Sequence, residues 1–268
     1  MKLLLVSDLH YALKQYDWTA AAASEFDAVV IAGDQIDISG HVDGSVQIVV
    51  ILKYLKRLRQ ATQLIVASGN HDLDTRDEAG EKVARWMDQV RALGIPTDGD
   101  TVMLGDTLVT ICPWWDGPRS REAVEAQLAR DAERPKKSWL WVYHAPPEGS
   151  PTSWSGQRFY GDGDLLHWIK AYEPDLVFAG HIHQAPFCEG GSWADQIGRT
   201  WVFNCGQQMG PIPTHVVIDT QTGEAVWVSM DGAQRLALDR PMARPFAQLT
   251  TAPPWLEPRP QNPGPNPA

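Results

Sequence analysis

Five short motifs in this chain carry side chains that can bind metal ions. Along the sequence they are Asp8-Leu9-His10, Gly33-Asp34-Gln35-Ile36-Asp37, Gly69-Asn70-His71-Asp72, His144 and Gly180-His181-Ile182-His183. They offer carboxylate, amide and imidazole groups, which suit Mn, Fe, Zn, Co or Ni better than Ca or Mg. No cysteine lies in the set, which argues against a structural zinc site. The motifs therefore predict a water-exposed centre for two hard or borderline metal ions.

Short apolar runs must position these motifs. Five runs have the composition of strands buried on both faces, at residues 2–7, 27–32, 63–67, 139–143 and 175–179, and a motif follows each one. Apolar residues at helical spacing predict amphipathic helices near residues 48–58, 83–90, 120–133 and 165–172. This alternation predicts an α/β core with mostly parallel pairing. Since the carboxyl ends of parallel strands meet at one edge of a sheet, the motifs can converge there.

The chain changes character after about residue 200. Residues 200–204, 214–219 and 224–230 have the pattern of consecutive strands with a turn at 221–223, which predicts hairpins and a second sheet built by this half. Prolines then accumulate, and such a stretch cannot propagate a helix or a strand ladder. We expect one domain over residues 1–238 and a proline-rich tail over residues 239–268, which is either disordered or held against the body by Phe246 and Trp255.

Composition narrows the classes of function. The 268 residues carry a formal net charge of -10, which argues against a broad nucleic-acid-binding surface. A phosphate substrate is still compatible, because bound metals reverse the local sign of the charge. No apolar run is long enough for a transmembrane helix, and the apolar residues 1–6 are too few for a signal sequence. The three cysteines, Cys112, Cys188 and Cys205, form no Cys-x-x-Cys pair, so we expect reduced thiols in a cytoplasmic protein.

Each motif alone has an ordinary explanation. Asp-x-His occurs often by chance, a Gly-Asp pair is commonly a turn, and a histidine at a strand end is usually a core or rim residue. All five in one order, each at a strand end, favour a shared site. In this combination the chain resembles the calcineurin-like metallophosphoesterase superfamily over residues 8–183. Its Asp-x-His and Gly-Asn-His-Asp motifs are similar to those of the bacterial cyclic-nucleotide phosphodiesterases and of the family's DNA exonucleases.

The resemblance implies a fold and a set of metal ligands. The fold would be an α/β four-layer α/β/β/α sandwich of two mixed sheets. Two divalent or trivalent metal ions would be bound, with Mn, Fe or Zn as the candidates. The first ion would be held by Asp8, His10, Asp34 and His183. The second ion would be held by Asp34, Asn70, His144 and His181, so that Asp34 bridges the two.

Four further residues are candidates for catalysis or substrate binding. By the resemblance, His71 is not a ligand and would donate a proton or hydrogen bond to the leaving oxygen. Asp37 would pair with His71, and its alternative role is a turn cap. Trp114 could stack on an organic group, with ordinary packing as the alternative, and Arg158 could clamp a phosphate. Three histidines match no motif and are expected at the surface or in packing: His41, His167 and His215.

The predicted function is hydrolysis of a small-molecule phosphoester. A metal-bridging hydroxide would attack phosphorus while the metals neutralise charge on its oxygens. Asp37 is followed by Ile38-Ser39-Gly40 instead of the Asp-Arg-Gly of the family's protein phosphatases, which argues against protein dephosphorylation. We therefore expect a phosphodiesterase for small or nucleotide-type substrates, with nucleic acid disfavoured and no membrane partner. The alternatives are a phosphomonoesterase or DNA exonuclease of the same family, or a non-catalytic binding scaffold.

Overall fold

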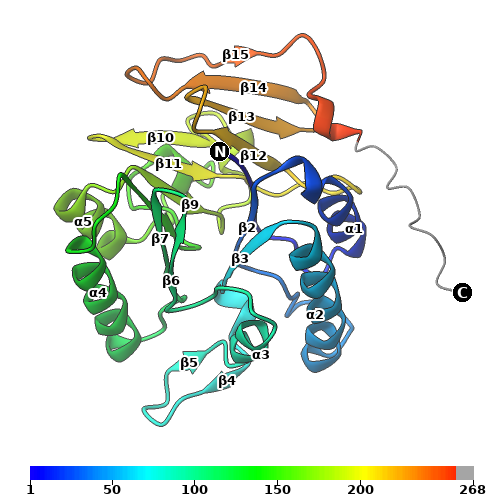
Figure 1. Ribbon diagram of the computed structural model, residues 1–268, viewed down its shortest axis with the longest axis vertical. Helices are drawn as coiled ribbons and strands as arrows, with labels where there is room; N and C mark the ends of the chain where they lie inside the picture. Colours follow the sequence, from blue (N-terminus) through cyan, green and yellow to red (C-terminus); the bar gives the residue numbers. More distant parts are fainter. Residues whose placement is uncertain (258–268) are drawn as a thin grey trace, which may run out of the picture.

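The computed structural model describes residues 1–257 and builds them around two mixed sheets (Figure 1). The first sheet contains β1 (Lys2–Val6), β2 (Ala28–Ala32), β3 (Gln63–Ala67), β12 (His215–Asp219), β13 (Glu224–Ser229), β14 (Gly232–Ala237) and β15 (Ala247–Gln248). The second contains β6 (Thr101–Leu104), β7 (Thr107–Ile111), β8 (Ser138–Val142), β9 (Leu176–Ala179), β10 (Ala194–Ile197) and β11 (Thr200–Asn204). The strand orders are β15-β14-β13-β12-β1-β2-β3 and β10-β11-β9-β8-β7-β6. A separate short hairpin joins β4 (Thr75–Arg76) to β5 (Lys82–Val83).

Helices cover the outer face of each sheet. The first sheet packs against α1 (Leu13–Ala22), α2 (Gly44–Ala61) and α3 (Met87–Ala92), and the second against α4 (Pro118–Ala132) and α5 (Gly163–Tyr172). Successive side chains of a strand point to opposite faces. Leu4 therefore joins the helices of the first layer, while Leu3 and Leu5 face the second sheet. The result is the predicted α/β/β/α sandwich, which is confirmed.

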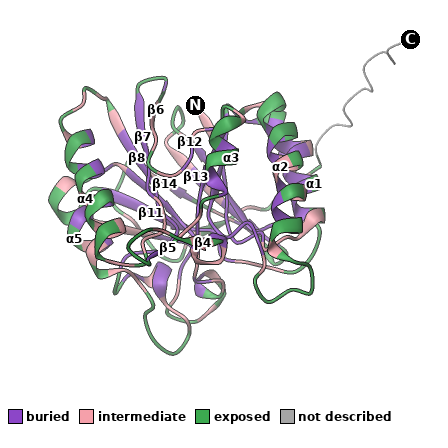
Figure 2. Cartoon of the chain, turned by 90° about the horizontal axis from the view of Figure 1, so that it is seen from below, coloured by how far each residue is buried: buried purple, intermediate pink, exposed green. Residues whose placement is uncertain are grey.

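Burial follows from this layering. Figure 2 shows the central strands in purple as almost wholly buried, with exposed green surface on the outer sides of the helices. The apolar runs identified in the sequence are strands enclosed on both faces, as an interior parallel sheet requires. On the outer face of the second sheet, Trp139 and Trp141 pack against Trp168 of α5 and Leu128 of α4.

Parallel pairing gathers the strand ends that carry the motifs. In the first sheet β1, β2 and β3 run parallel. In the second sheet β7, β8, β9 and β11 run parallel. The carboxyl ends within each sheet therefore share one edge, and the two edges face each other across the sandwich. This confirms the α/β core predicted up to residue 180.

The second half of the chain differs from the sequence expectation. β11 adds to β9 in the second sheet, whereas β12 returns to the first sheet and pairs antiparallel with β1. The second sheet already begins at β6, so the prediction that residues after 200 build it was wrong. Turn signals and alternation predict hairpins, but they do not identify the sheet edge to which a hairpin attaches. The helix expected from residue 83 begins only at Met87, because Val83 lies in β5.

The end of the chain lies partly within the described residues. β15 pairs antiparallel with β14, and Trp255 packs into the cluster between the first sheet and its helices. Phe246 packs beside Trp193, with ring centroids 4.9 Å apart. Residues 258–268 of the proposed tail lie outside the described residues. Among residues 1–257, the helices all lack the combination of length and apolar character needed to cross a membrane.

Candidate metal centre

The predicted ligands lie just beyond the carboxyl ends of parallel strands. Asp8 follows β1, Asp34 follows β2, His144 follows β8 and His181 follows β9. Asn70 begins a short 3-10 helix, Asn70–Asp72, after β3. Glycine is required where these loops meet. Gly33 has a positive φ of 95°, and a Cβ there would overlap the His144 ring. A side chain at that position would therefore push a candidate ligand away.

The backbone at four candidate ligands is unusual. Asp8, His10, Asp34 and His181 all have positive φ, between 40° and 69°. Residues other than glycine rarely adopt this conformation, and each instance costs on the order of 1–3 kcal/mol. Such strain persists only where the surrounding contacts enforce it. Asp8, His10 and Asp34 place potential ligand atoms within 4.8 Å of one another, and His181 does so with Asp34.

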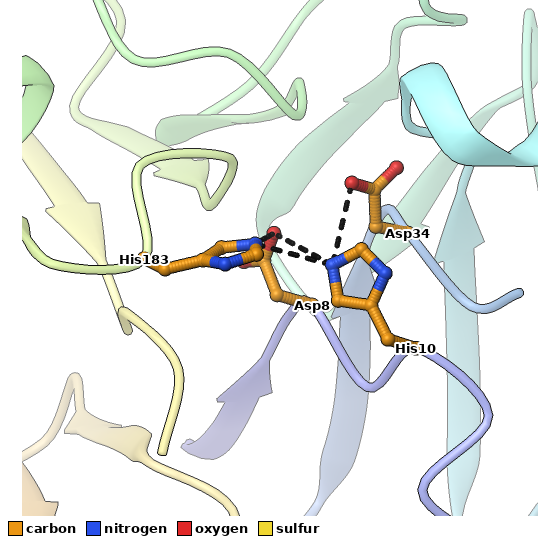
Figure 3. Close-up of side chains that lie close together, drawn as sticks. All are labelled: Asp8, His10, Asp34 and His183. Carbon is orange, nitrogen blue, oxygen red and sulfur yellow. Dashed lines mark hydrogen bonds and ion pairs between the residues drawn. The ribbon is translucent and has the colours of Figure 1, made fainter. Parts of the chain in front are cut away.

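The first group of candidate ligands is Asp8, His10, Asp34 and His183, whose potential ligand atoms all lie within 4.8 Å of one another. Figure 3 shows the two imidazoles converging on the aspartates. His183 Nε2 lies 3.2 Å from Asp8 Oδ1, and His10 Nε2 lies 3.1 Å from His183 Nε2. Two ring nitrogens aimed at the same space beside carboxylates form a donor set suited to a borderline cation.

The second group consists of Asp34, His144 and His181, again within 4.8 Å. His144 Nδ1 lies 2.6 Å from the carbonyl oxygen of Ala32, to which it donates, so that Nε2 faces Asp34 Oδ2 at 3.1 Å. Such a hydrogen bond fixes the orientation and tautomer of a metal-binding histidine. Asp34 belongs to both groups.

Two buried polar atoms test whether a metal fits here. Asn70 Oδ1 and His144 Nε2 are buried and make no well-oriented hydrogen bond within the described residues. Leaving a buried polar atom unpaired costs about 1–3 kcal/mol. A cation bound between the oxygen and the nitrogen would satisfy both atoms. The residues present therefore fit a metal ion.

The charges at the centre are strongly coupled. Burial acts to raise the pKa of Asp8, but His144 and His183 outweigh it and hold that pKa below its ordinary value. Burial acts to lower the pKa of His144, but Asp34 and Asp8 outweigh it and raise that pKa to about 9. For His181, burial together with His144 lowers the pKa to about 4. A metal bound at His144 Nε2 would compete with a proton for that nitrogen.

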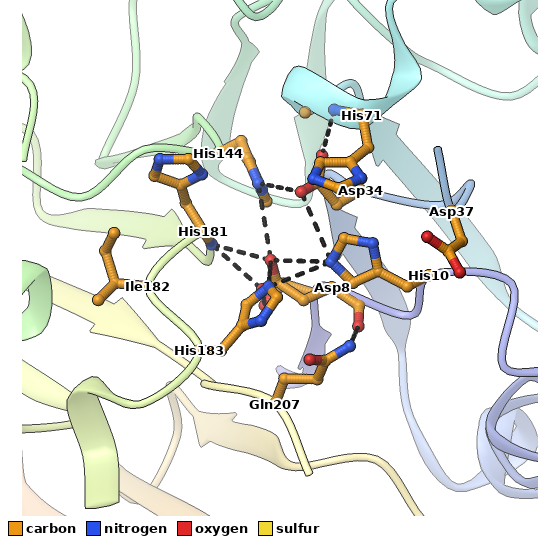
Figure 4. A network of polar contacts seen from close by, with 12 residues as sticks. Asp8, His10, Asp34, Asp37, His71, His144, His181, Ile182, His183 and Gln207 are labelled. Atoms are coloured by element: carbon orange, nitrogen blue, oxygen red, sulfur yellow. Dashed lines mark hydrogen bonds and ion pairs between the residues drawn. The ribbon is translucent and has the colours of Figure 1, made fainter. Parts of the chain in front are cut away.

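His71 and Asp37 lie beside the centre, as Figure 4 shows. The His71 ring packs edge-on against His10, with centroids 4.6 Å apart. His10, Asp37 and His71 place potential ligand atoms within 4.8 Å of one another. Asp37 Oδ1 also accepts hydrogen bonds from the backbone N–H and the hydroxyl of Ser39, at 2.8 and 2.6 Å. Asp37 therefore caps a turn and lies near His71 as well.

Asp72, which the sequence suggests as a loop hydrogen-bonding residue, and Gln207, which sequence reasoning missed, support the candidate ligands. Asp72 is fully buried, and its carboxylate accepts hydrogen bonds from the N–H groups of Gln35, Ile36 and Gly69. It thus ties the loop of Asp34 to the loop of Asn70. Gln207 donates to the carbonyl oxygen of Asp8 at 3.0 Å (Figure 4). Its position shortly after β11 is the sequence signal that could have identified it.

The candidate substrate residues lie at different distances from the ligands. The Trp114 ring is 5.1 Å from that of His181 and 5.7 Å from that of His144. Arg158 lies on an exposed loop with its guanidinium 4.1 Å from the Tyr160 ring centre. The structure therefore places Trp114 beside two of the candidate ligands.

Comparison with known proteins gives the family context. A family model described as calcineurin-like phosphoesterase matches residues 1–185, which contain all five motifs. Among solved structures, TT1561 of Thermus thermophilus is 13% identical with a TM-score of 0.57, covering 88% of this chain and 98% of that one. The purple acid phosphatase PPD1 of yellow lupin (Lupinus luteus) is 12% identical with a TM-score of 0.54, covering 89% and 52%. At these identities the likeness concerns the fold. No curated protein matches the sequence.

Proposed function

The chain belongs to the calcineurin-like phosphoesterase family and is a metal-dependent phosphoesterase, and from that premise we propose that it hydrolyses small phosphodiesters at a centre of two metal ions. The observation that carries the proposal is the position of Asp34. Its Oδ2 lies 3.7 Å from His10 Nε2 of one group and 3.1 Å from His144 Nε2 of the other. A shared carboxylate of this kind is the usual bridge between two metals.

The proposed ligands divide into two sets. The first ion would be held by Asp8, His10, Asp34 and His183. The second would be held by Asp34, Asn70, His144 and His181. When bound, Mn, Fe or Zn ions would supply positive charge for a phosphate and lower the pKa of water. Within residues 1–257, the carboxylates of Asp8 and Asp34 make ion pairs only with histidines. Attraction of an anionic substrate therefore depends on the metals.

His71 is proposed to assist the leaving group. Its backbone N–H donates to Asp34 Oδ1 at 2.9 Å, which holds the residue at the rim of the centre. Its buried Nδ1 makes no hydrogen bond within the described residues, and the ring is half-buried beside His10. A positioned imidazole can donate a proton to a departing alkoxide near neutral pH. Asp37, whose carboxylate lies within 4.8 Å of a ring nitrogen of His71, would keep the ring oriented.

A diester is favoured over a monoester by the surroundings of the centre. An aromatic side chain, Trp114, lies directly beside His181 and His144. A phosphodiester carries a second organic group that such a surface can hold, whereas a monoester offers a second negative charge. Arg158, the basic residue first proposed for phosphate, is turned onto Tyr160. These features support the phosphodiesterase over the phosphomonoesterase.

The proposal is tested by metal analysis combined with two chromogenic substrates. With Mn added, turnover of bis-p-nitrophenyl phosphate should exceed that of p-nitrophenyl phosphate, and bound metal should approach about two ions per chain. A preference for the monoester would replace the diesterase with a phosphomonoesterase. Degradation of DNA ends would favour the exonuclease. Bound metal without turnover of any of these would favour the binding scaffold.

A reducing location is proposed from the cysteines. Cys112, Cys188 and Cys205 are all free thiols in the structure, and two of them are buried. Free thiols are the normal state in the cytoplasm. We therefore propose a cytoplasmic enzyme, which fractionation of cells expressing the tagged protein would test.

A further inference from the structure

A cavity lined by aromatic residues opens beside the metal centre. It has a volume of about 470 Å³ and is lined by Trp114, Trp115, Tyr143, Tyr160, Asp162 and His181, among others. We call this cavity the aromatic pocket. Its size is typical of a small-molecule site. Since His181 is a proposed metal ligand, a group bound in the pocket would be only a short tether away from a phosphate at the metals.

Asp162 organises two of the aromatic walls. Its Oδ2 accepts hydrogen bonds from Trp115 Nε1 at 2.9 Å and from the Tyr143 hydroxyl at 2.7 Å. Its Oδ1 accepts from the backbone N–H of Leu165 at 2.9 Å, at the start of α5. The carboxylate therefore fixes the edges of both rings, and both residues line the pocket.

The charge of Asp162 is not neutralised by a neighbouring cation. Its three donors are neutral groups, and within residues 1–257 no lysine, arginine or histidine forms an ion pair with it. The other carboxylate of the lining, Asp164, is paired with Arg121 at 2.6 Å. The pocket thus combines aromatic side chains with one carboxylate that forms no ion pair within the described residues and caps the start of α5. It would repel a second phosphate or a carboxylate.

Trp114, another aromatic residue of the pocket, lies against the metal centre. The backbone N–H of Trp114 donates to the Ser68 hydroxyl at 3.1 Å, and Ser68 directly precedes the Gly69-Asn70 motif. The ring lies against His181 and His144. At the rim, the Tyr160 ring is already covered by the Arg158 guanidinium, which leaves Trp114 and Trp115 as the rings for a ligand. Aromatic faces around a carboxylate are the surroundings that stabilise an alkylammonium group.

On the basis of the phosphodiesterase function proposed above, we propose that the aromatic pocket binds a quaternary ammonium group, so that the substrates are phosphodiesters carrying a choline-type alkylammonium group. The cation lies against Trp115 and Trp114, near the Asp162 carboxylate. The phosphate is then held at the metals. A diester with a neutral group of the same shape binds without the cation–π and carboxylate contributions.

The test uses two diesters that share one leaving group. p-Nitrophenyl phosphocholine and p-nitrophenyl 3,3-dimethylbutyl phosphate have the same shape, and only the first carries a positive charge. We expect kcat/KM for the choline ester to be at least about tenfold higher, a typical effect of a desolvated cation–π contact. A ratio near one in the wild-type protein would overturn the ammonium assignment.

Two variants and a matched control test whether the preference for the choline ester depends on the aromatic pocket. Asp162→Asn removes the charge and keeps the shape, and Trp115→Leu removes a ring, so each should lower the ratio several-fold. Asp239→Asn, which removes an exposed carboxylate outside the pocket, should leave the ratio unchanged. An equal loss of activity toward both esters in the two pocket variants, with the ratio retained, would contradict the assignment.

Separate measurements distinguish failure of the proposed phosphodiesterase function from failure of the ammonium pocket. Turnover of bis-p-nitrophenyl phosphate reports on the phosphodiesterase alone. If that substrate is hydrolysed and the ratio is one, only the ammonium pocket is refuted. If no diester is hydrolysed, the ammonium pocket is tested by binding of tetramethylammonium. Binding is measured by the quenching of tryptophan fluorescence in the wild type and in Trp115→Leu. Saturable quenching that is weaker in the variant supports the pocket, and no quenching in the wild type refutes it.

Discussion

The indole Nε1 of Trp255 donates a hydrogen bond to Nε2 of His215 over 3.0 Å, and both side chains are buried. His215 Nδ1 in turn donates to the carbonyl oxygen of Pro213 at 2.9 Å. The histidine is therefore held as the neutral tautomer with its proton on Nδ1. The Trp18 ring of α1 lies against it, with centroids 4.7 Å apart. Together these contacts fix the last described 3-10 helix, Pro254–Leu256, onto the body of the protein.

We expect this histidine to make folding stability depend on pH. Burial lowers the pKa of His215 to about 4, below its ordinary value, so protonation favours the unfolded chain. Its contribution is complete above pH 6.5 and is lost as the pH falls toward 4. The free energy of unfolding in urea should therefore drop by about 2 kcal/mol more for the wild type than for His215→Phe between pH 7.5 and 5. If the difference in the free energy of unfolding between the two proteins is the same at both pH values, His215 is not the source of the pH dependence.

Replacement of the shared carboxylate should empty both metal sites. Asp34→Asn removes the charge that the two groups of ligands have in common, so metal retained after dialysis should fall from about two ions per chain to less than one. Elemental analysis measures this directly. Asp37→Asn is the matched control, because Asp37 lies beside the centre and belongs to neither proposed ligand set. Retention of one full ion in Asp34→Asn would show that Asp34 serves a single site.

Much of this architecture was accessible from the sequence because burial on both faces leaves a continuous apolar run. Val29, Val30 and Ile31 of β2 are an example, and the polar residue that follows, Asp34, stands out against them. The pair β6–β7 was missed. Its threonines and the Gly105-Asp106 turn form a mixed pattern, because β6 is an edge strand that is only partly buried.

The geometry of the candidate ligands could be predicted less well from the sequence. The positive φ values of Asp8, His10, Asp34 and His181 oppose local preference, and only tertiary contacts impose them. One such contact is the pair of hydrogen bonds from the N–H of His181 to the Asp8 carboxylate, at 3.0 and 3.2 Å. These join residues 173 positions apart. A sequence motif identifies the side chains, but it carries no information about such a contact.

Loss of the His71 imidazole should reduce turnover without removing metal. Because His71 would protonate the leaving oxygen, His71→Ala should lower kcat about 10²- to 10⁴-fold for alkyl leaving groups. The effect should be smaller for p-nitrophenolate, which departs without a proton. Parallel kinetics on alkyl and p-nitrophenyl esters, with metal analysis of the same samples, would check this. Loss of metal in His71→Ala would instead identify the histidine as a ligand.

Removal of Asp72 should weaken both the fold and metal binding. Its carboxylate accepts the N–H groups of Gln35, Ile36 and Gly69, so Asp72→Ala leaves three buried donors unpaired and should destabilise the protein by about 3 kcal/mol. The loops of Asp34 and Asn70 then lose their common anchor, and metal affinity should fall about 10- to 100-fold. Urea unfolding and metal titration measure the two effects. Asp88→Ala, at an exposed carboxylate of α3, should change neither. A destabilised Asp72→Ala with unaltered metal affinity would show that Asp72 supports the loops without positioning the ligands.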